Sequence, residues 1–512
     1  MFLVGAGPGD PGLLTLRGAE CLRRADVVLY DYLVDPLVLE HCAPAAERVA
    51  LGHHSAGRSD TPKDVIAKMV AAARAGRIVV RLKGGDPELF ARGADEIDAL
   101  RAAGIDYELV PGVTAATAAA ATAEIPLTHH NYASAVALVT GHQRGDKTGP
   151  GLDWAELARF PGTLVFYMGV RSAAHWSAAL LSTGKSPETP VVIIHRATFG
   201  DQRVIRCALR NVAETIEREA IRPPAVIIVG PVAALAPRAS WFARRPLAGR
   251  SVLVTRPELS GRLRVYGDAT SDPLGRGLAE LGAIVVAQPA VRLADPPDWR
   301  GVDGALAALE TYDWIVFSSA NGVRALLGRL LETGGDVRRF GRARLAVIGP
   351  GTAAELARFS LRPDLVPAEY RAESLVEALA GEASRGRFLL IRASRGRDVL
   401  AEGLRAAGAA KVDQVVAYQS LDVERADPAV VEALASGRIE WVTVTSSSAA
   451  EWLVRTFGSA LRRAKLASLG PVTAETLARL GYPSTVEARP FTIDGLIAAI
   501  ARNAAELGQQ AP

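Results

Sequence analysis

The chain has 512 residues, a formal net charge of +4 and 49% hydrophobic residues. This length exceeds what one hydrophobic core normally supports, so we expect about three or four packed lobes, and the composition excludes a disordered chain. The small charge, carried by scattered Arg among Asp and Glu, excludes a basic stripe for nucleic-acid phosphates. No apolar run is long enough for a membrane span, and the first residues lack a secretory signal pattern, so we predict a cytoplasmic protein.

The first half of the chain alternates short apolar runs with amphipathic segments, the pattern of an α/β domain. The predicted strands lie at 2–7, 27–30, 78–82, 136–141, 163–169, 191–197 and 225–230. They end repeatedly in Gly, Asp or Thr. Ligands of open α/β sheets bind outside the carboxyl ends of the strands, so we expect a functional site on these loops.

A segment rich in Pro, Gly and Arg at 236–250 interrupts this pattern, and we place a linker at 241–249 between domains at 1–240 and 250–505. The second domain alternates again and contains two matched pairs of segments, 348–356 with 469–477 and 317–323 with 445–452. These pairs predict two similar lobes, with the chain crossing between them near 290 and 420. A cleft between two lobes is a natural site for a small molecule.

Two carboxylates in the first half follow predicted strands. Asp31 could act as a base or a ligand anchor, or simply cap a helix. Asp86 follows Gly84 and Gly85, which allow close approach of a ligand to the backbone, although a plain turn also explains the pattern. The glycine-rich segment at 5–12 contains Pro8, which spoils the tight turn of a dinucleotide fingerprint, so an NAD site is disfavoured.

Thr114 and Ala115 begin a predicted helix of very small side chains, where a ligand can contact bare backbone or where the helix can simply pack tightly. The His pairs at 53–54 and 129–130 are adjacent, so their rings diverge and give no zinc spacing. The three Cys are odd in number and widely spaced. We therefore predict no metal site.

The second half contains neither His nor Cys, so its chemistry must use hydroxyls, carboxylates, Arg or backbone amides. Tyr418 follows an apolar strand and is a candidate site residue, although a core or rim tyrosine also explains it. Hydroxyl side chains stand at strand ends or helix starts, where they can bind a ligand or cap a helix. These are Ser318, Ser319, Thr352, Ser446, Ser447 and Thr473.

At these motifs, residues 1–240 resemble the uroporphyrinogen-III C-methyltransferases of the tetrapyrrole methylase family. The shared motifs, in family order, are VGAGPGDPGLLTLRG, VVRLKGGDP, VPGVTAAT, IPLTH, VTGH and FYMG. The resemblance implies two α/β lobes with S-adenosylmethionine between them, S-adenosylhomocysteine as product, Asp31 as base and His53 at the position of a proton donor. It assigns cofactor contact to Pro8, Gly84, Gly85, Asp86, Leu89, Thr114, Ala115, Met168 and Ala197.

Residues 250–505 resemble uroporphyrinogen-III synthase through VLVTRP, FSSANGV, VIGPGTA, VVAYQS, TSSSA and SLGPVTA, in the family's order. This resemblance implies a two-lobed module of parallel-sheet α/β domains that cyclises hydroxymethylbilane. It makes Tyr418 the acid candidate and implies substrate contact by Ser318, Thr352, Ser447 and Thr473.

Three features depart from these patterns. His53 and His130 replace a Lys and an Arg, and because histidine titrates near neutral pH we expect the activity to depend on pH. Glu124 stands where the methylase family prefers Gly. The segment at 260–277 has no explanation in the synthase pattern.

Together the resemblances imply a bifunctional enzyme that forms uroporphyrinogen III with inversion of ring D and methylates it twice to precorrin-2, on the sirohaem and cobalamin branch. The alternatives are a methylase of a later precorrin, which the second half disfavours, and a methyltransferase with a catalytically silent tetrapyrrole-binding module. The implied partners are tetrapyrroles and a second copy of the chain, bound through the first half. We expect no nucleic-acid or membrane partner.

Overall fold

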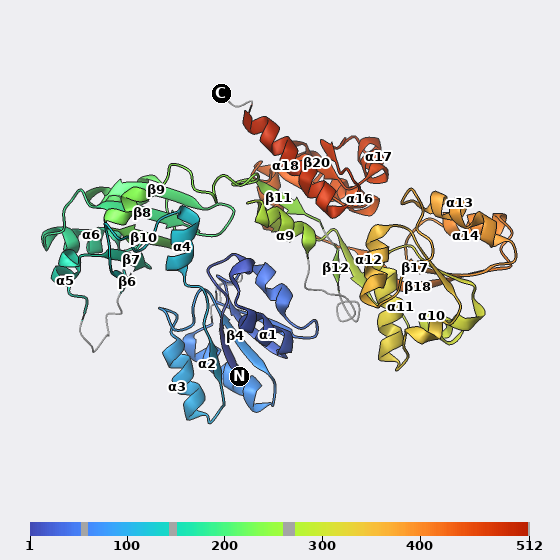
Figure 1. Cartoon of the computed structure of the whole chain (residues 1–512), viewed down its shortest axis with the longest axis horizontal. Coiled ribbons are helices and arrows are strands. Elements are labelled where there is room, and N and C mark those ends of the chain that lie inside the picture. Colours follow the sequence, from blue (N-terminus) through green and yellow to red (C-terminus); the bar gives the residue numbers. More distant parts are fainter. Residues whose placement is uncertain (53–59, 143–150, 256, 260–271, 510–512) are drawn as a thin grey trace. The chain divides into compact units, whose positions relative to one another are not determined.

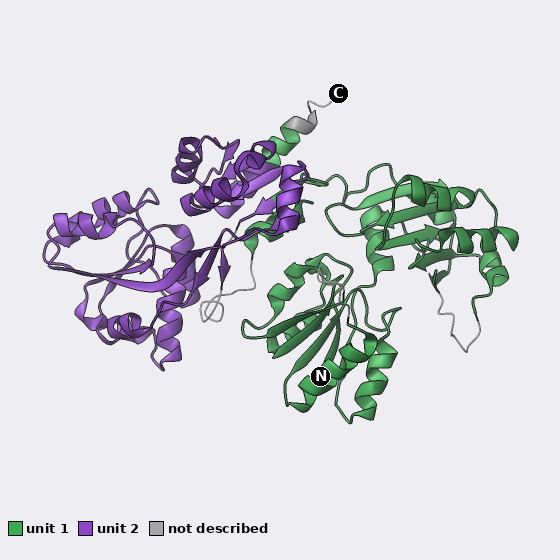
Figure 2. Cartoon of the chain, turned by 180° about the vertical axis from the view of Figure 1, so that it is seen from behind, with its two compact units in different colours: residues 1–252, 272–285, 501–512 green, residues 253–271, 286–500 purple. Residues whose placement is uncertain are grey.

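The structure is a computed structural model that describes residues 1–52, 60–142, 151–255, 257–259 and 272–509 (Figure 1). The chain divides into two compact units (Figure 2). One comprises residues 1–252, 272–285 and 501–512, and the other comprises 253–271 and 286–500. His53 and residues 260–271 of the unexplained segment lie outside the described residues. Across the described ranges, no helix combines the length and apolar character needed to cross a bilayer.

The first sheet is fully parallel, with strand order β3-β2-β4-β1-β5. Its strands are β1 (Phe2–Gly5), β2 (Val27–Asp31), β3 (Glu47–Leu51), β4 (Val79–Lys83) and β5 (Glu108–Val110). Helices α1 (Leu16–Arg24), α2 (Pro62–Arg74) and α3 (Gly93–Ala102) alternate with them. β4 is central and buried along its whole length, as expected for a parallel strand covered on both faces.

The second sheet is mixed, with order β6-β7-β10-β8-β9. β6 and β7 are parallel, whereas the remaining neighbours are antiparallel. Its strands are β6 (Val136–Thr140), β7 (Thr163–Tyr167), β8 (Pro190–His195), β9 (Arg203–Ala208) and β10 (Ala225–Val229). The helices are α4 (Ala115–Ala123), α5 (Trp154–Arg159), α6 (Ala173–Ser182) and α7 (Val212–Arg218). The small side chains of α4 pack against β7, β8 and β10, which explains its alanine-rich sequence.

The third sheet has order β13-β11-β19-β20-β21, and its strands are β11 (Ser251–Val254), β13 (Ile284–Ala287), β19 (Trp441–Val444), β20 (Lys465–Ser468) and β21 (Val486–Glu487). Its helices are α9 (Pro273–Glu280), α16 (Ser447–Phe457), α17 (Pro471–Arg479) and α18 (Ile493–Gln509). β19, β20 and β21 run parallel.

The fourth sheet has order β12-β14-β18-β17-β15-β16 and is parallel except between β14 and β18. Its strands are β12 (Glu258–Leu259), β14 (Val291–Ala294), β15 (Trp314–Phe317), β16 (Arg344–Val347), β17 (Arg387–Ala393) and β18 (Lys411–Asp422). The helices of this part are α10 (Arg300–Ala307), α11 (Ala320–Glu332), α12 (Pro350–Arg358), α13 (Ala372–Ala383) and α14 (Val399–Ala406), whereas α15 (Pro428–Ala435) packs against the short helix Gly458–Arg463 beside the third sheet. The predicted α/β class is confirmed.

The matched sequence pairs adopt matching elements. Ser319 caps α11 and Ser446 caps α16, each accepting a hydrogen bond from the backbone N–H three residues later. Gly349 before α12 and Gly470 before α17 both have fully extended backbones followed by Pro. The same local sequence therefore builds a strand, a capped helix, a second strand and a Pro-initiated helix in both places.

Candidate functional site

Three glycines bring the ends of β1, β4 and β5 together. A Cβ on Gly112 would lie 2.2 Å from the carbonyl oxygen of Gly85 and 2.8 Å from Cα of Gly5, so no side chain fits there. Gly85 has φ of +70°, and no described atom lies within 4 Å of the place its Cβ would take. The loop after β4, which begins at Gly84, therefore presents bare backbone to open space at the carboxyl end of the sheet.

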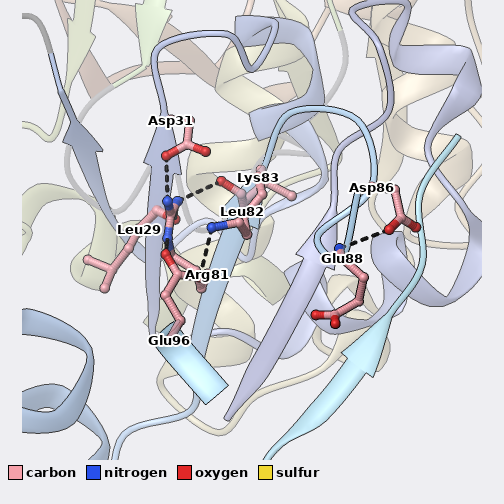
Figure 3. A network of polar contacts seen from close by, with 8 residues as sticks. All are labelled: Leu29, Asp31, Arg81, Leu82, Lys83, Asp86, Glu88 and Glu96. Carbon is pink, nitrogen blue, oxygen red and sulfur yellow. Dashed lines mark hydrogen bonds and ion pairs between the residues drawn. The ribbon is translucent and has the colours of Figure 1, made fainter. Parts of the chain in front are cut away.

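Asp86 ties two of these loops together. Its Oδ1 accepts a hydrogen bond from the backbone N–H of Glu88 at 2.9 Å (Figure 3). Its Oδ2 accepts one from the backbone N–H of Gly112 at 3.0 Å. Asp86 thus performs the turn-building role that the sequence left open, and each carboxylate oxygen keeps a further lone pair for a ligand donor.

A tyrosine joins the start of α4 to the end of β7. The hydroxyls of Thr114 and Tyr167 lie 2.5 Å apart, and the backbone N–H of Ala116 donates to the Tyr167 hydroxyl at 2.9 Å. Burial raises the pKa of Tyr167, with small opposing effects from these hydrogen bonds, and the Phe90 ring lies 5.0 Å from its ring. Thr114 therefore contacts a neighbouring strand end rather than capping its own helix.

The loop containing Pro8 meets the loop that follows β8. The Thr198 hydroxyl donates to the carbonyl of Pro8 at 3.3 Å and accepts from the backbone N–H of Asp10 at 3.0 Å. Ala197, beside it, is buried. Met168 follows β7 and is half exposed. Of the other candidates, Leu89 lies half-buried in the loop after β4 and Ala115 begins α4.

Backbone strain concentrates on the same loops. Phe90, Met168, Arg196 and Thr198 have φ between 50° and 73°, a region that side-chain-bearing residues rarely adopt. Such conformations persist only where the surrounding structure enforces them, and they gather at ligand sites. The structure thus collects all nine candidate cofactor residues on loops or helix starts that follow strands β1, β4, β5, β7 and β8.

Asp31 ends β2 on the same edge of the first sheet, and its carboxylate binds Arg81 (Figure 3). The Arg81 Nη2 lies 2.5 Å from Asp31 Oδ1, and Nε lies 3.0 Å from Glu96 Oε1. Lys83 Nζ lies 2.8 Å from the other oxygen of Glu96. Sequence reasoning did not select Arg81, Lys83 or Glu96. The available signal was two cations at alternate positions of a strand expected to be buried on both faces.

These residues suit a nucleoside that carries an amino-acid group. Bare backbone after Gly84 and Gly85 allows close contact, the Asp86 carboxylate can accept from ribose hydroxyls or an ammonium group, and the buried apolar residues nearby suit a flat ring. No group of three or more His, Cys, Asp or Glu within the described ranges could hold a metal ion.

A cavity of about 290 Å³ lies in the second unit, at the carboxyl ends of β15 and β17. Ser318, Ser319 and Tyr418 line it. The hydroxyls of Tyr418 and Ser319 lie 2.9 Å apart. A bulge in β18 opposite Arg392 and Ala393 shifts the register next to Tyr418, and residues 417 and 418 are both buried. Burial raises the pKa of Tyr418, so its phenol keeps its proton at neutral pH.

Three arginines at the end of β17 also line this cavity, and sequence reasoning missed them. Arg395 pairs with Asp422 at 2.6 Å and Arg397 with Glu373 at 2.7 Å, and both arginines are more than half exposed. Arg392 pairs with Asp398. Exposed ion pairs contribute only about 0.2–1 kcal/mol, so a carboxylate of a ligand can replace these partners. The three Arg in RASRGR, directly after a predicted strand, were the available signal.

The remaining hydroxyl candidates lie elsewhere in this unit. Thr352 is buried within α12, and Thr473 is buried within α17. Ser447 begins α16, where it accepts from the Thr476 hydroxyl at 3.0 Å. None of the three lines the cavity around Tyr418.

Glu124, one of the departures from the family pattern, makes a contact that glycine could not make. It ends α4 with φ of +55°, the left-handed conformation that glycine adopts most easily. Its carboxylate accepts a hydrogen bond from the backbone N–H of Trp241 at 2.6 Å, and the Trp241 indole donates to the Ala121 carbonyl at 3.0 Å. The glutamate thus adopts a strained backbone conformation, and its side chain forms a hydrogen bond to the segment after the second sheet.

Two protein families match this chain. Tetrapyrrole (Corrin/Porphyrin) Methylases match residues 1–213, and Uroporphyrinogen-III synthase HemD matches residues 272–498. The Porphyrin biosynthesis protein HemD of Ruminiclostridium josui is 31% identical over 97% of this chain and 96% of its own length. The chain therefore belongs to the tetrapyrrole methylase family in its first part and to the uroporphyrinogen-III synthase family in its second, which confirms both resemblances.

Other relatives are more similar over a smaller share of the chain. Uroporphyrinogen-III C-methyltransferase of Bacillus subtilis is 37% identical over 70% of this chain and 71% of its own length. Siroheme synthase of Zymomonas mobilis is 46% identical over 48% of this chain and 51% of its own length. A solved uroporphyrin-III C-methyl transferase from Thermus thermophilus, complexed with S-adenyl homocysteine, is 40% identical over 46% of this chain and 93% of its own, with a TM-score of 0.39. The chain thus carries a methyltransferase domain and a uroporphyrinogen-III synthase domain of tetrapyrrole biosynthesis.

Proposed function

We propose that this protein catalyses two consecutive reactions of tetrapyrrole biosynthesis. The synthase domain cyclises hydroxymethylbilane to uroporphyrinogen III with inversion of ring D, and the methyltransferase domain adds two methyl groups to give precorrin-2. Matches to siroheme synthases over about half of the chain favour the sirohaem branch. The observation that carries the proposal is the match of a porphyrin biosynthesis protein along 97% of this chain and 96% of its own length.

In the methyltransferase domain, the loops after β1, β4, β5, β7 and β8 would hold S-adenosylmethionine, whose sulfonium supplies an electrophilic methyl group. Bare backbone at Gly85 would admit the ligand closely, and Asp86 offers acceptors for its hydroxyl or ammonium groups. Pro8, Leu89, Thr114, Ala115, Met168 and Ala197 complete the proposed binding set.

Asp31 is the proposed base of this domain. Methylation of a pyrrole carbon leaves one ring proton in excess, and its removal restores conjugation. The Asp31 side chain is 31% exposed, so a substrate can reach it, and it stands at the same sheet edge as the cofactor loops. We assign the proton-donor role to His53 only by its place in the family motif.

In the synthase domain, Tyr418 is the proposed acid. A hydroxymethyl group leaves as water once its oxygen is protonated, and the protonated phenol lies 2.9 Å from the hydroxyl of Ser319 in a cavity with three arginines. The arginines suit the acetate and propionate side chains of the substrate. The cavity volume is near the lower end of ligand sites, so it would take one part of a large tetrapyrrole. Ser318, Thr352, Ser447 and Thr473 are further proposed contacts.

The deciding experiment incubates the purified protein with hydroxymethylbilane, with and without S-adenosylmethionine, and separates the isomers and methylated products. We expect uroporphyrinogen III without the methyl donor and precorrin-2 with it. Type I isomer alone would show that the second domain is a silent binding module. Type III isomer without methylation would contradict the proposed methyltransferase reaction.

A further inference from the structure

Two cations lie on one buried face of the central strand of the first sheet. Arg81 and Lys83 are two residues apart in β4, so their side chains point to the same face, where they are 4% and 2% exposed. Helix α3 covers this face and contributes Glu96, which is 6% exposed. Buried charges are stable only when they are paired and hydrogen-bonded.

The guanidinium of Arg81 is held on every side. Its Nη1 donates to the carbonyls of Leu82 at 3.0 Å and Leu29 at 3.4 Å, its Nε donates to Glu96, and its Nη2 donates to Asp31 (Figure 3). Arg81 therefore cannot rotate without breaking bonds to two strands and one helix. A planar fork fixed in this way defines the position of the carboxylate that it binds.

The cluster contains two basic and two acidic side chains. Arg81 and Lys83 supply two positive charges, and Glu96 supplies one negative charge. The fourth charge is the Asp31 carboxylate, the one member of the cluster that is substantially exposed, with 31% of its side chain accessible. Three buried polar side chains thus surround one face of an accessible carboxylate at the edge of the site.

We propose that Arg81 is a positioning residue for methyl transfer, which fixes the Asp31 carboxylate toward the substrate, and that Glu96 and Lys83 hold Arg81 in place. This inference rests on the proposed role of Asp31 as base. The cluster connects the core under α3 to the reacting end of the sheet, so the core of this lobe sets the geometry of the base.

The test is a double-mutant cycle in the full-length protein. Arg81→Gln, Asp31→Asn and the double variant are compared for kcat and KM of uroporphyrinogen methylation, for S-adenosylhomocysteine binding and for thermal unfolding. Misplacement of a reacting group by about 1 Å lowers the rate roughly 100-fold, so we expect R81Q to lower kcat by about 10- to 100-fold. The KM for S-adenosylmethionine and the affinity for S-adenosylhomocysteine should stay within about twofold, because Arg81 touches no cofactor loop.

A structural role and a positioning role of Arg81 predict different changes of kcat in the double-mutant cycle. If Arg81 acts through Asp31, R81Q lowers kcat in the wild-type background but adds no loss in the D31N background. An equal loss in both backgrounds would overturn the proposal. Full kcat of D31N would remove Asp31 as base, and the absence of methylation by the wild-type protein would refute the proposed function itself.

Two further variants keep the test decisive. Removing one partner of a buried ion pair is strongly destabilising, so if R81Q does not fold, the cycle is run with Arg81→Lys, which keeps the charge but cannot reach Glu96 and Asp31 together. Partial recovery of kcat in R81K supports positioning, whereas full recovery would show that charge alone matters and would overturn it. Arg17→Gln is the matched control, because Arg17 makes two 2.7 Å bonds to Glu108 on the exposed surface of the same sheet.

Discussion

Replacement of Gly85 by alanine tests where the cofactor lies. Gly85 has φ of +70° and Gly104 has φ of +65°, and no described atom lies within 4 Å of the Cβ that either substitution would add. An alanine in this backbone region costs about 1–2 kcal/mol, and the reduced freedom of the unfolded chain offsets about 0.4–1 kcal/mol of this. We therefore expect both variants to lose about 1 kcal/mol of unfolding free energy.

The two glycines differ in what faces them. Gly85 lies at the carboxyl end of β4, on the proposed cofactor loop, whereas Gly104 lies between α3 and β5, before the amino end of its strand. A methyl group forced into a filled site costs about 1–3 kcal/mol, which corresponds to about a 5- to 150-fold increase in Kd. We expect this loss for S-adenosylhomocysteine in G85A and an unchanged Kd in G104A.

The assay pairs calorimetric titration of S-adenosylhomocysteine with thermal unfolding of both variants. For a domain of this size, 1 kcal/mol corresponds to a Tm decrease of about 2–4 °C, and the decrease should be the same for both glycines. Equal Kd values for G85A, G104A and the unaltered protein would refute the placement of the cofactor on the β4 loop. A Kd increase in both variants would show that backbone strain spreads through the sheet.

Three other predictions concern the remaining sites. Tyr418→Phe should lower the rate of type III isomer formation about 100-fold, as expected for loss of a general acid. Tyr312→Phe is the control, because Tyr312 is also buried but lies outside the cavity, and it should leave the rate unchanged. Full activity of Y418F in an isomer assay would exclude Tyr418 as the acid. Glu124→Gly should change the urea midpoint of unfolding little, because relief of the left-handed backbone, about 1 kcal/mol, opposes loss of the hydrogen bond to Trp241. Glu124→Gln keeps the strained backbone and weakens the hydrogen bond, so it should be the less stable of the two variants. Burial and a hydrogen bond to a carboxylate raise the pKa of Tyr312 to about 12, above its usual value of about 10. The stability that this phenol contributes is therefore complete below pH 10 and lost as the pH rises through about 12. The difference in unfolding free energy between the unaltered protein and Y312F should be larger at pH 8 than at pH 10.5.

Local sequence patterns predicted much of the fold. The alternation of apolar runs located seven of the ten described strands of the first half and missed β3, β5 and β9. Ser319 and Ser446 cap helices, as hydroxyls before helices should. These features depend on interactions within a few residues, so a single sequence contains them. The antiparallel pairing of β8 with β9 and β10 was not predicted, because strand direction depends on how distant segments pair.

The site was predicted as a set of loops but not as a set of contacts. Gly84, Gly85 and Asp86 were selected because glycine lets a ligand approach the backbone and because their motif resembles that of the methylase family, although a plain turn also explains the pattern. Tyr167 was not selected, since its role arises from a hydroxyl contact with Thr114 across 53 positions of sequence. The three arginines around Tyr418 were missed because each resembles an ordinary surface cation when taken alone.

The sequence by itself determined the α/β class, the two family memberships and the loops on which chemistry is expected, because these follow from periodicity and from motifs of adjacent residues. Only the tertiary structure decided which charges meet. Arg81 and Glu96 lie 15 positions apart on a strand and a helix, and Asp31 comes from a neighbouring strand. Pairing of buried charges depends on distances of about 3 Å set by packing, and neither periodicity nor composition specifies such distances.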